Sequence, residues 1–263
     1  MSHAVSTNPK HCKVFLLGTS ALVCLALAAP VMADDFVITS SDGSTNGTGT
    51  RNGGTARLMA TDINGSDTVS LGIALTTTGT NVGIKTNNND TEAQSNTVTV
   101  TKTGSITTGA GNNAYGIFND GAYNTTTVSG SITTAGFFAN GIRNDGNYNK
   151  TTLSGSITTT GNYAMGIANY GDNNTTTISG TVKATGAKSA ALYNVYGSGN
   201  SFTLNEGATI IGDILASDYT NNSADATNSK LIFNLGASTS YAYSVSGKGQ
   251  GTGGGQWIFS DLD

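Results

Sequence analysis

The sequence predicts an all-β fold, a parallel β-helix (solenoid) with coils of about 25 residues. The first observation is a repeat: Gly116, Gly141 and Gly166 are evenly spaced, and each is followed by Ile and, two residues after that, by Asn. The second is local composition, because short runs rich in Thr, Ser, Val and Ile alternate with Gly, Asn and Asp, which is typical of strands and turns. The third is that no segment has the apolar spacing of an amphipathic helix.

The repeats are expected to fold only by stacking. One repeat buries about four apolar side chains worth about 1.5–3 kcal/mol each, whereas ordering it costs about 1.5 kcal/mol per residue. If each repeat forms one coil, equivalent residues lie about 4.8 Å apart and every strand pairs above and below. A β-propeller, with units of about 40–50 residues, is the chief alternative. Three apolar columns are then expected: Ile117, Ile142, Ile167 and Leu192; Val128, Leu153 and Ile178; and Ile132, Ile157 and Val182.

Residues 1–33 are predicted to be a helical signal peptide that is removed on export. A basic stretch at 10–13 precedes an apolar run at 14–29, and Val31-Met32-Ala33 places small residues at the −3 and −1 positions of a cleavage site. A transmembrane anchor is the alternative, but it would need roughly 20 apolar residues, and this run is shorter. The mature chain would begin near Asp34.

The mature chain is divided into three predicted parts. Residues 34–66 form an N-terminal cap and a diverged first coil, residues 67–217 form the β-helix repeats, and residues 218–263 form C-terminal coils. All Cys, His and Pro residues lie in the first 30 positions, so the mature chain would lack them. This excludes disulfides, Ser-His-Asp and Cys-His catalysis, and most zinc or iron sites. We therefore expect no cofactor, no metal site and no catalytic residue.

Charge also restricts the partners. The whole chain carries a net charge of −4, and the expected loss of Lys10 and Lys13 with the signal peptide would make it more negative. A negative chain with few arginines is a poor match for nucleic acid or an anionic membrane surface.

The repeat unit "SGSITTTGNYAMGIANYG", the signal peptide, the cysteine-free mature chain and the closing "LIFNLGASTSYAYSVSGKGQGTGGGQWIFSDLD" together resemble the passenger region of a bacterial autotransporter (type V secretion). The resemblance covers most of the mature sequence. It implies a right-handed β-helix that is exported across the inner and then the outer membrane. The implied location is the cell surface, the outer membrane or the medium, or the periplasm if no barrel is supplied.

The chain departs from this family at its C-terminus. Autotransporters end in a translocator barrel, and even the smallest barrel needs 8 strands of about 9–11 residues. Few residues follow Asp218, and the final Asp261-Leu262-Asp263 is not typical of a barrel strand. We therefore expect a passenger without its translocator, either a fragment, a truncated reading frame or a partner of a separate barrel.

The expected function is non-enzymatic: an elongated, repetitive surface for adhesion to a host surface or for self-association. The alternative is a polysaccharide-acting β-helix enzyme, a lyase or a glycosidase. Stacking would place Asp120 and Asp145 roughly 5 Å apart, as retaining glycosidases hold their carboxylates. Both residues, however, lie in Asn-Asp-Gly turns, and a turn role is the simpler interpretation. A third reading is ice binding through outward Thr125 and Thr127, a row that Lys150 interrupts.

Three further sets of residues have two readings each. The Asn row either coordinates a ligand or forms a side-chain amide ladder, and we favour the ladder. The turn aromatics either bind sugars or fill corners of the solenoid. The Asn-x-Thr sequons matter only in a eukaryotic secretory pathway. The Asn row is Asn119, Asn144, Asn169 and Asn194; the aromatics are Tyr123, Tyr148, Phe137, Phe138 and Tyr163; the sequons begin at Asn124, Asn149 and Asn174.

Overall fold

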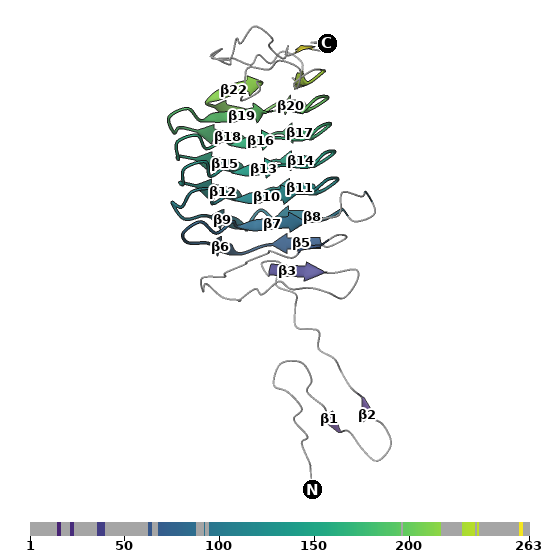
Figure 1. The fold of residues 1–263 in the computed structure, drawn as a ribbon. Helices are drawn as coiled ribbons and strands as arrows, with labels where there is room; N and C mark the ends of the chain where they lie inside the picture. The colour runs from purple at the N-terminus through teal and green to yellow at the C-terminus, as the bar shows by residue number, and fades with distance from the viewer. Residues whose placement is uncertain are drawn as a thin grey trace.

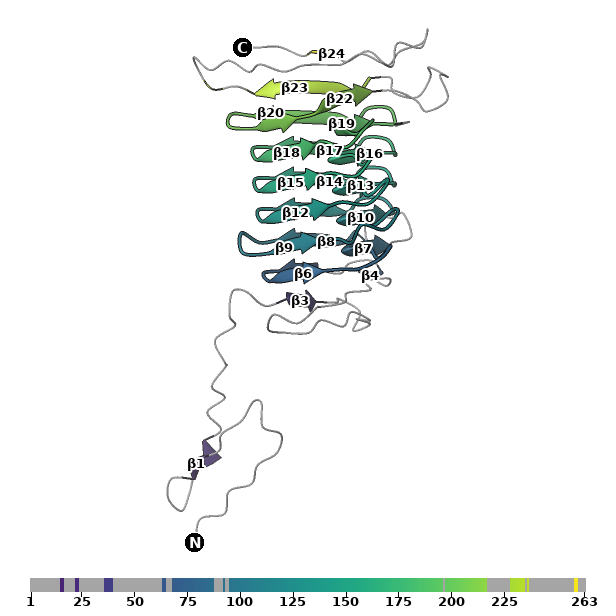
Figure 2. The same cartoon turned by 90° about the vertical axis from the view of Figure 1, so that its left-hand side faces the viewer.

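The computed structural model describes residues 15–16, 22–23, 36–39, 63–64, 68–87, 92, 95–195, 197–216, 228–234, 236 and 258–259. These residues form a three-sided parallel β-helix in which strands stack directly above one another (Figure 1). Three strands make one coil, and each belongs to a different sheet (Figure 2). The stacked parallel strands confirm the predicted solenoid and exclude the propeller.

The three sheets have seven, nine and six strands. The seven-stranded sheet consists of β4 (Ile63–Asn64), β7 (Ile84–Asn87), β10 (Ile117–Asp120), β13 (Ile142–Asn144), β16 (Ile167–Asn169), β19 (Ala190–Asn194) and β22 (Asp213–Ala216). The nine-stranded sheet consists of β3 (Phe36–Thr39), β5 (Thr68–Leu71), β8 (Thr97–Val100), β11 (Thr125–Val128), β14 (Lys150–Leu153), β17 (Thr175–Ile178), β20 (Ser201–Asn205), β23 (Lys230–Asn234) and β24 (Ile258–Phe259). The six-stranded sheet consists of β6 (Ala74–Thr76), β9 (Ser105–Thr107), β12 (Ser131–Thr134), β15 (Ser156–Thr159), β18 (Thr181–Ala184) and β21 (Thr209–Ile211).

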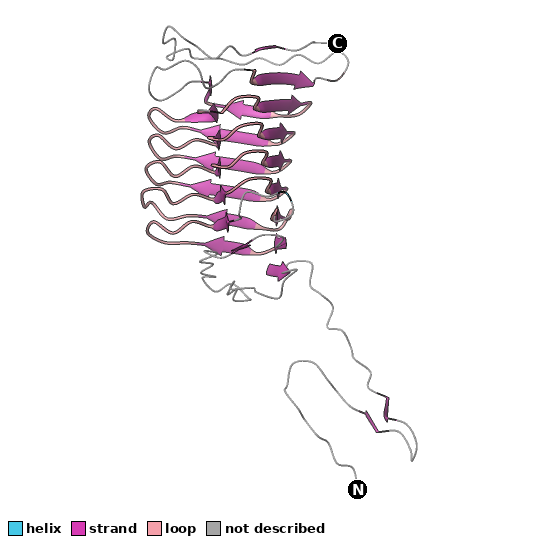
Figure 3. Ribbon diagram, turned by 45° about the vertical axis from the view of Figure 1, so that its right-hand side comes forward, coloured by secondary structure: helices cyan, strands magenta, loops and turns pink. Residues whose placement is uncertain are grey.

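Successive coils are numbered here from the one that contains β4, β5 and β6, so coil three contains β10, β11 and β12, and coil six ends with β21. Turns and short loops join the strands, and the described residues contain no α-helix (Figure 3). In that part of the chain, no helix is long and apolar enough to cross a membrane.

The predicted columns are present in the register of the strands. Ile117 pairs with Ile142, Ile142 with Ile167, and Ile167 with Leu192. The other two columns follow the same rule. All of these side chains are buried and belong to one continuous hydrophobic core. The apolar interior is therefore built by placing each residue on its own copy one coil away.

Threonines also enter the interior, which the sequence did not predict. In β11, Thr126 and Val128 point inward while Thr125 and Thr127 are half-buried on the outer side. Thr126 pairs with Thr151, and Thr151 with Thr176, so a threonine column runs beside the Val128 column. All three threonines are buried. The polar interior of coils three to five must therefore satisfy its hydroxyl groups by hydrogen bonding.

Glycine recurs because the coils approach too closely for a side chain. At Gly141, an added Cβ would meet the Cγ2 atom of Ile157 and the carbonyl oxygen of Gly166 in the next coil. At Gly155, it would meet the carbonyl oxygen of Gly130 in the coil before. The repeat of Gly in the sequence thus marks both the inner wall and the corners of the solenoid.

The N-terminal end is built differently. β3 pairs with β5 in the antiparallel direction, whereas β5 to β23 run parallel throughout the nine-stranded sheet. Most of the predicted helical signal peptide, 1–33, lies outside the described residues. The four residues that are described there, in β1 (Phe15–Leu16) and β2 (Leu22–Val23), form a short antiparallel pair. The predicted boundaries at 33, 66 and 217 stay predictions.

Replacing Gly141 by Ala should destabilise the fold by about 1–3 kcal/mol, because the added methyl group overpacks the interior against Ile157. The free energy of unfolding in urea measures this loss. Thr133→Ala, on the exposed side of β12, is the matched control and should change the stability by about 0.5 kcal/mol or less. Equal stability of the two variants would contradict the close approach described for Gly141.

Candidate functional site: the aromatic face

The three outer surfaces of the solenoid differ in composition. Among residues 68–216 whose side chains the structure describes, every aromatic residue except the core residue Phe202 lies on the outer side of the seven-stranded sheet or at the two corners that flank it. The outer sides of the other two sheets carry mainly Thr, Ser and Lys. We call the outer side of the seven-stranded sheet, together with its two flanking corners, the aromatic face. Its aromatic residues are Tyr115, Phe118, Tyr170 and Tyr193 on the sheet, Phe137, Phe138 and Tyr163 at the corner before it, and Tyr123 and Tyr148 at the corner after it.

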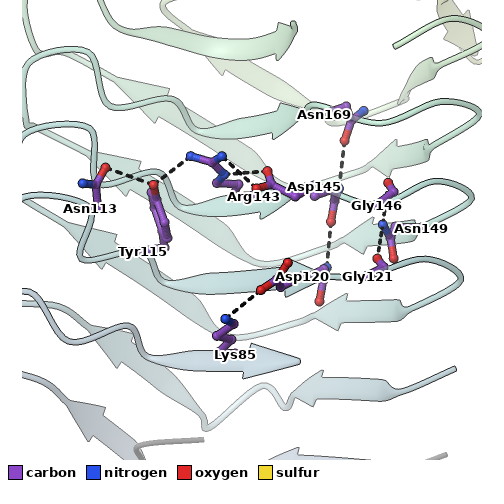
Figure 4. Close-up of polar contacts among 12 residues, drawn as sticks. Lys85, Asn113, Tyr115, Asp120, Gly121, Arg143, Asp145, Gly146, Asn149 and Asn169 are labelled. Atoms are coloured by element: carbon purple, nitrogen blue, oxygen red, sulfur yellow. Dashed lines mark hydrogen bonds and ion pairs between the residues drawn. The ribbon is translucent and has the colours of Figure 1, made fainter. Parts of the chain in front are cut away.

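Arg143 is at the centre of this face. It lies in β13 between two inward residues, so its side chain points outward. Its Nε and Nη2 atoms donate to the two carboxylate oxygens of Asp145 at 2.6 and 2.7 Å, and its Nη1 atom donates to the Tyr115 hydroxyl at 2.8 Å (Figure 4). The Tyr170 ring lies 4.2 Å from the guanidinium carbon. A single arginine therefore connects three consecutive coils through an ion pair, a hydrogen bond and a cation–π contact.

Burial changes the acidity of the groups around Arg143. Burial raises the pKa of Tyr170 to about 12, although the charge of Arg143 acts in the opposite direction. The pKa of the Tyr115 phenol is also raised by burial, again against the effect of Arg143. For Arg143 itself, burial acts to lower the pKa, but the hydrogen bonds and charge of Asp145 outweigh it and hold the pKa above its usual value. At neutral pH the cluster therefore contains neutral phenols around a charged guanidinium group.

The two carboxylates that could have formed a catalytic pair are each bound to a cation. Asp120 forms an ion pair with Lys85, with 2.7 Å between Oδ2 and Nζ, and Asp145 forms an ion pair with Arg143 (Figure 4). Lys85 comes from the coil before Asp120, whereas Arg143 lies in β13, two residues before Asp145 in the same coil. Each carboxylate is thus paired with its own cation, and both ion pairs contribute to the packing of the face.

The turn aromatics are divided between the two corners. Tyr123 and Tyr148 stack at one corner, with ring centroids 5.0 Å apart and planes 9° from parallel. At the other corner, Phe137 packs against Phe138 at 4.5 Å and against Tyr163 at 5.3 Å. Phe137 and Tyr148 are 40% and 50% exposed, so their rings are available to solvent. The sequence grouped these five residues correctly as turn aromatics, but it could not show that they flank one sheet.

Most of the corner aromatics have an unusual backbone. Tyr123 and Tyr148 have φ values of 61° and 58°, and Phe138 and Tyr163 have 54° and 55°. Few non-glycine residues adopt this left-handed conformation, and Asn is the commonest of them. Asn173 takes the same conformation one coil above Tyr148, with φ of 55°. The corner backbone is therefore set by the coil geometry, and the chain can place either an aromatic ring or an amide on it.

The Asn row forms a buried amide ladder and no external site. Asn119 Nδ2 donates to Asn144 Oδ1 at 2.7 Å, and Asn144 Nδ2 donates to Asn169 Oδ1 at 2.8 Å (Figure 4). Thr86 Oγ1 donates to Asn119 Oδ1 at 3.1 Å at the first rung. Asn194 leaves the ladder, because its Oδ1 atom accepts from Asn200 Nδ2 at 2.6 Å. All members are buried, so no ligand reaches them in the folded chain.

A second asparagine column was missed in the sequence. The backbone N–H of Asn124 donates to Asn149 Oδ1 at 2.8 Å, and the backbone N–H of Asn149 donates to Asn174 Oδ1 at 2.7 Å. These are the Asn residues of the sequons, and all three are fully buried. These residues recur once in every repeat, directly before the Thr-rich strand, and this recurrence is the signal from which the column could have been predicted. Glycosylation would require the folded corner to open, so these residues are structural.

The outward threonines lie where the sequence placed them. Thr125 is paired with Lys150, so the charge interrupts this column, whereas Thr127 continues into Thr152 and Thr177. This nine-stranded surface carries no described aromatic side chain.

The regular pattern of the two asparagine columns is interrupted between coils five and six. Asn174 aligns with Asn200, 26 residues away, whereas Asn149 aligns with Asn174 at 25. Phe202 takes the inward place above Thr176. As a result, Asn169 Nδ2, Asn174 Nδ2 and Thr176 Oγ1 are buried and have no hydrogen-bond partner among the described residues. The extra residue in this turn therefore interrupts the hydrogen bonds that buried polar groups form from coil to coil in the interior.

Comparison with protein-family models, with curated proteins and with solved structures finds no match for this chain. Among the described residues, no group of three or more His, Cys, Asp or Glu side chains lies close enough to hold a metal ion.

Thr176→Val should raise the free energy of unfolding by about 1 kcal/mol, because it removes a buried hydroxyl that has no partner in the described part of the chain. Thr151→Val, one coil below, is the matched control: it removes the acceptor of Asn144 Nδ2 and should cost about 1–2 kcal/mol. Urea unfolding of both variants tests the pair. If Thr176→Val costs as much as Thr151→Val, the Thr176 hydroxyl has a partner after all.

The stability of the fold should fall between pH 10 and pH 12. The pKa of the Tyr170 phenol is 10.0, the ordinary value for tyrosine, in the unfolded chain, and burial raises it to about 12 in the folded one. Between these values the folded state keeps a proton that the unfolded state loses, so the free energy of unfolding decreases as the pH rises. Tyr170→Phe should make this decline shallower, as measured by urea unfolding at several alkaline pH values. Tyr148→Phe, which removes an exposed phenol, is the control, and an equal effect of the two would contradict the role of burial.

Proposed function

We propose that this chain is a non-enzymatic, exported β-helical passenger of the autotransporter-like kind, and that it binds its partners through the aromatic face. The segregation of the aromatic residues carries the proposal. Two outer surfaces of the solenoid are covered by small hydroxyl-bearing residues, and one is covered by aromatic rings and paired charges. Aromatic side chains are costly to expose, and their gathering on one side of a protein is typical of an interaction surface.

The solenoid architecture supports a presenting role. Coils one to six stack into a rod whose interior is filled by its own repeated residues, which leaves the outer columns free to vary. The outer column of the seven-stranded sheet does vary, from Phe118 to Arg143, Ala168 and Tyr193, while the inner column beside it stays Ile or Leu. A rigid rod with one variable face suits adhesion to another surface or association between copies.

Export is supported by the N-terminal sequence alone, with its basic stretch, apolar run and small residues before Asp34. The passenger would then depend on a translocator barrel supplied from outside these residues. Adhesion is favoured over catalysis because Asp120 and Asp145 are each engaged by a cation.

The proposal predicts that the exported protein has lost residues 1–33, adheres to cells or to itself, and does not cleave polysaccharides. When the full chain is produced in a Gram-negative host, intact mass should place the N-terminus of the exported protein at Asp34. Beads coated with this protein should aggregate or attach to host cells, while uncoated beads should not. Incubation with neutral and acidic polysaccharides should release no new chain ends.

Two results would contradict the proposal. If the chain keeps residues 1–33 and stays in the cytoplasm, it is not exported, and the passenger function is contradicted. Release of new chain ends that is lost in Asp145→Asn or Asp120→Asn would instead identify a polysaccharide-acting enzyme.

A further inference from the structure

We infer that the aromatic face binds neutral carbohydrate chains and that Phe137 and Tyr148 supply the rings on which the sugars stack. This inference rests on the proposed function and names the class of its ligand. Both rings belong to coil four: Phe137 precedes β13 and Tyr148 follows it, so they lie at opposite corners of the same strand. They are the two exposed aromatic side chains among the described residues.

The two rings are held in place before any ligand arrives. Phe137 meets Phe138 edge-on, with planes at 81°, and Tyr163 at 63°. Tyr148 stacks on Tyr123, and its backbone is fixed in the left-handed region at φ 58°. A ring that is already packed on one side loses little conformational entropy when a ligand covers the other side.

The charges between the rings cancel. Lys85 pairs with Asp120, and Arg143 pairs with Asp145. At the neighbouring corners, Asp172 and Lys188 carry opposite charges as well. Where the charges near the rings are paired in this way, a polyanion or a polycation gains little electrostatic attraction.

Of the two roles proposed above, the amount of exposed apolar surface favours adhesion over association between copies of the chain. A stable protein interface buries about 800 Å² on each side and has an apolar core. Among the described residues of this face, Phe137 and Tyr148 are the large apolar side chains that are strongly exposed, and polar groups separate them. Isolated rings suit a sugar instead, because a pyranose presents an apolar face of C–H bonds that can cover a ring.

Polar atoms near the rings match the hydroxyl groups of such a ligand. The side chain of Asp120 is 43% exposed, so its carboxylate can accept hydrogen bonds from sugar hydroxyls. Asp145, with a side chain 25% exposed, offers a second acceptor that Arg143 holds in a fixed orientation. Apolar rings at both ends of the strand and oriented acceptors between them together form a surface that a neutral sugar chain can cross.

The test uses replacements that the chain itself employs at equivalent corners. Phe137→Asn copies Asn162, and Tyr148→Asn copies Asn173, which adopts the same positive φ. Binding of the full exported chain to neutral hexasaccharides of glucose, galactose, mannose and N-acetylglucosamine is measured by titration calorimetry. We expect at least one of them to bind, and the double variant to bind it at least about tenfold more weakly. Lys150→Thr, which copies Thr125 and Thr175 on the nine-stranded surface, should bind like the unchanged chain.

Several results would overturn the inference. Binding of heparin or polygalacturonate in preference to the neutral hexasaccharides would show that charge, not stacking, selects the ligand. Equal binding by the double variant and the unchanged chain would place the sugar elsewhere. If none of the four neutral hexasaccharides binds, the carbohydrate inference is wrong. If the coated beads nevertheless adhere to cells, the adhesive function holds and its partner is of another class.

Discussion

Backbone hydrogen bonds between identical positions of adjacent coils hold this protein together, and the other features follow from the short distance that they impose. In the seven-stranded sheet, the strands of coils two to six pair in parallel without a shift in register. At this spacing some positions of the coil, such as Gly130, Gly155 and Gly180, have no room for a Cβ atom, so glycine recurs at them. A side chain in the interior meets its own copy above and below, so the residues that serve best are those that pack or bond with themselves: Ile with Ile, and Asn with Asn.

The amide ladders fix the register more firmly than the apolar columns can. An Ile column would tolerate Leu or Val at any level, and the chain uses all three. An Asn that slipped by one residue would point outward and leave its neighbours' polar groups buried without partners, at a cost of about 1–3 kcal/mol each. The two asparagine columns, one with side-chain to side-chain bonds and one with backbone to side-chain bonds, flank the same corner. They ensure that the turn after each strand of the seven-stranded sheet returns to the same place.

Much of this fold could be predicted from the period of the sequence, and less of the candidate site. The columns of Ile117, Val128 and Ile132 were predictable because a repeat places like residues together whatever their conformation. Thr126 was assigned no inward role because a Thr-Thr-Thr run gives no alternation of polarity. The aromatic face was hidden for a different reason: Phe118, Arg143 and Tyr170 occupy positions that change from coil to coil, so a search for repetition passes over them. Only three-dimensional stacking brings Arg143 beside Tyr115 and Tyr170 from neighbouring coils.

The extra residue at the turn before Asn200 gives the rod a mechanical weak point. Coils two to five repeat their polar contacts from level to level, whereas the junction above Thr176 has three buried polar atoms for which the described residues supply no partner. In a solenoid, each coil is stabilised by its neighbours alone, so a local deficit is not shared with distant coils. A load applied along the axis would therefore separate the rod at this junction first, leaving the part that carries Phe137, Arg143 and Tyr148 wound. The coils that carry the aromatic rings would therefore stay folded when the coils beyond this junction unfold.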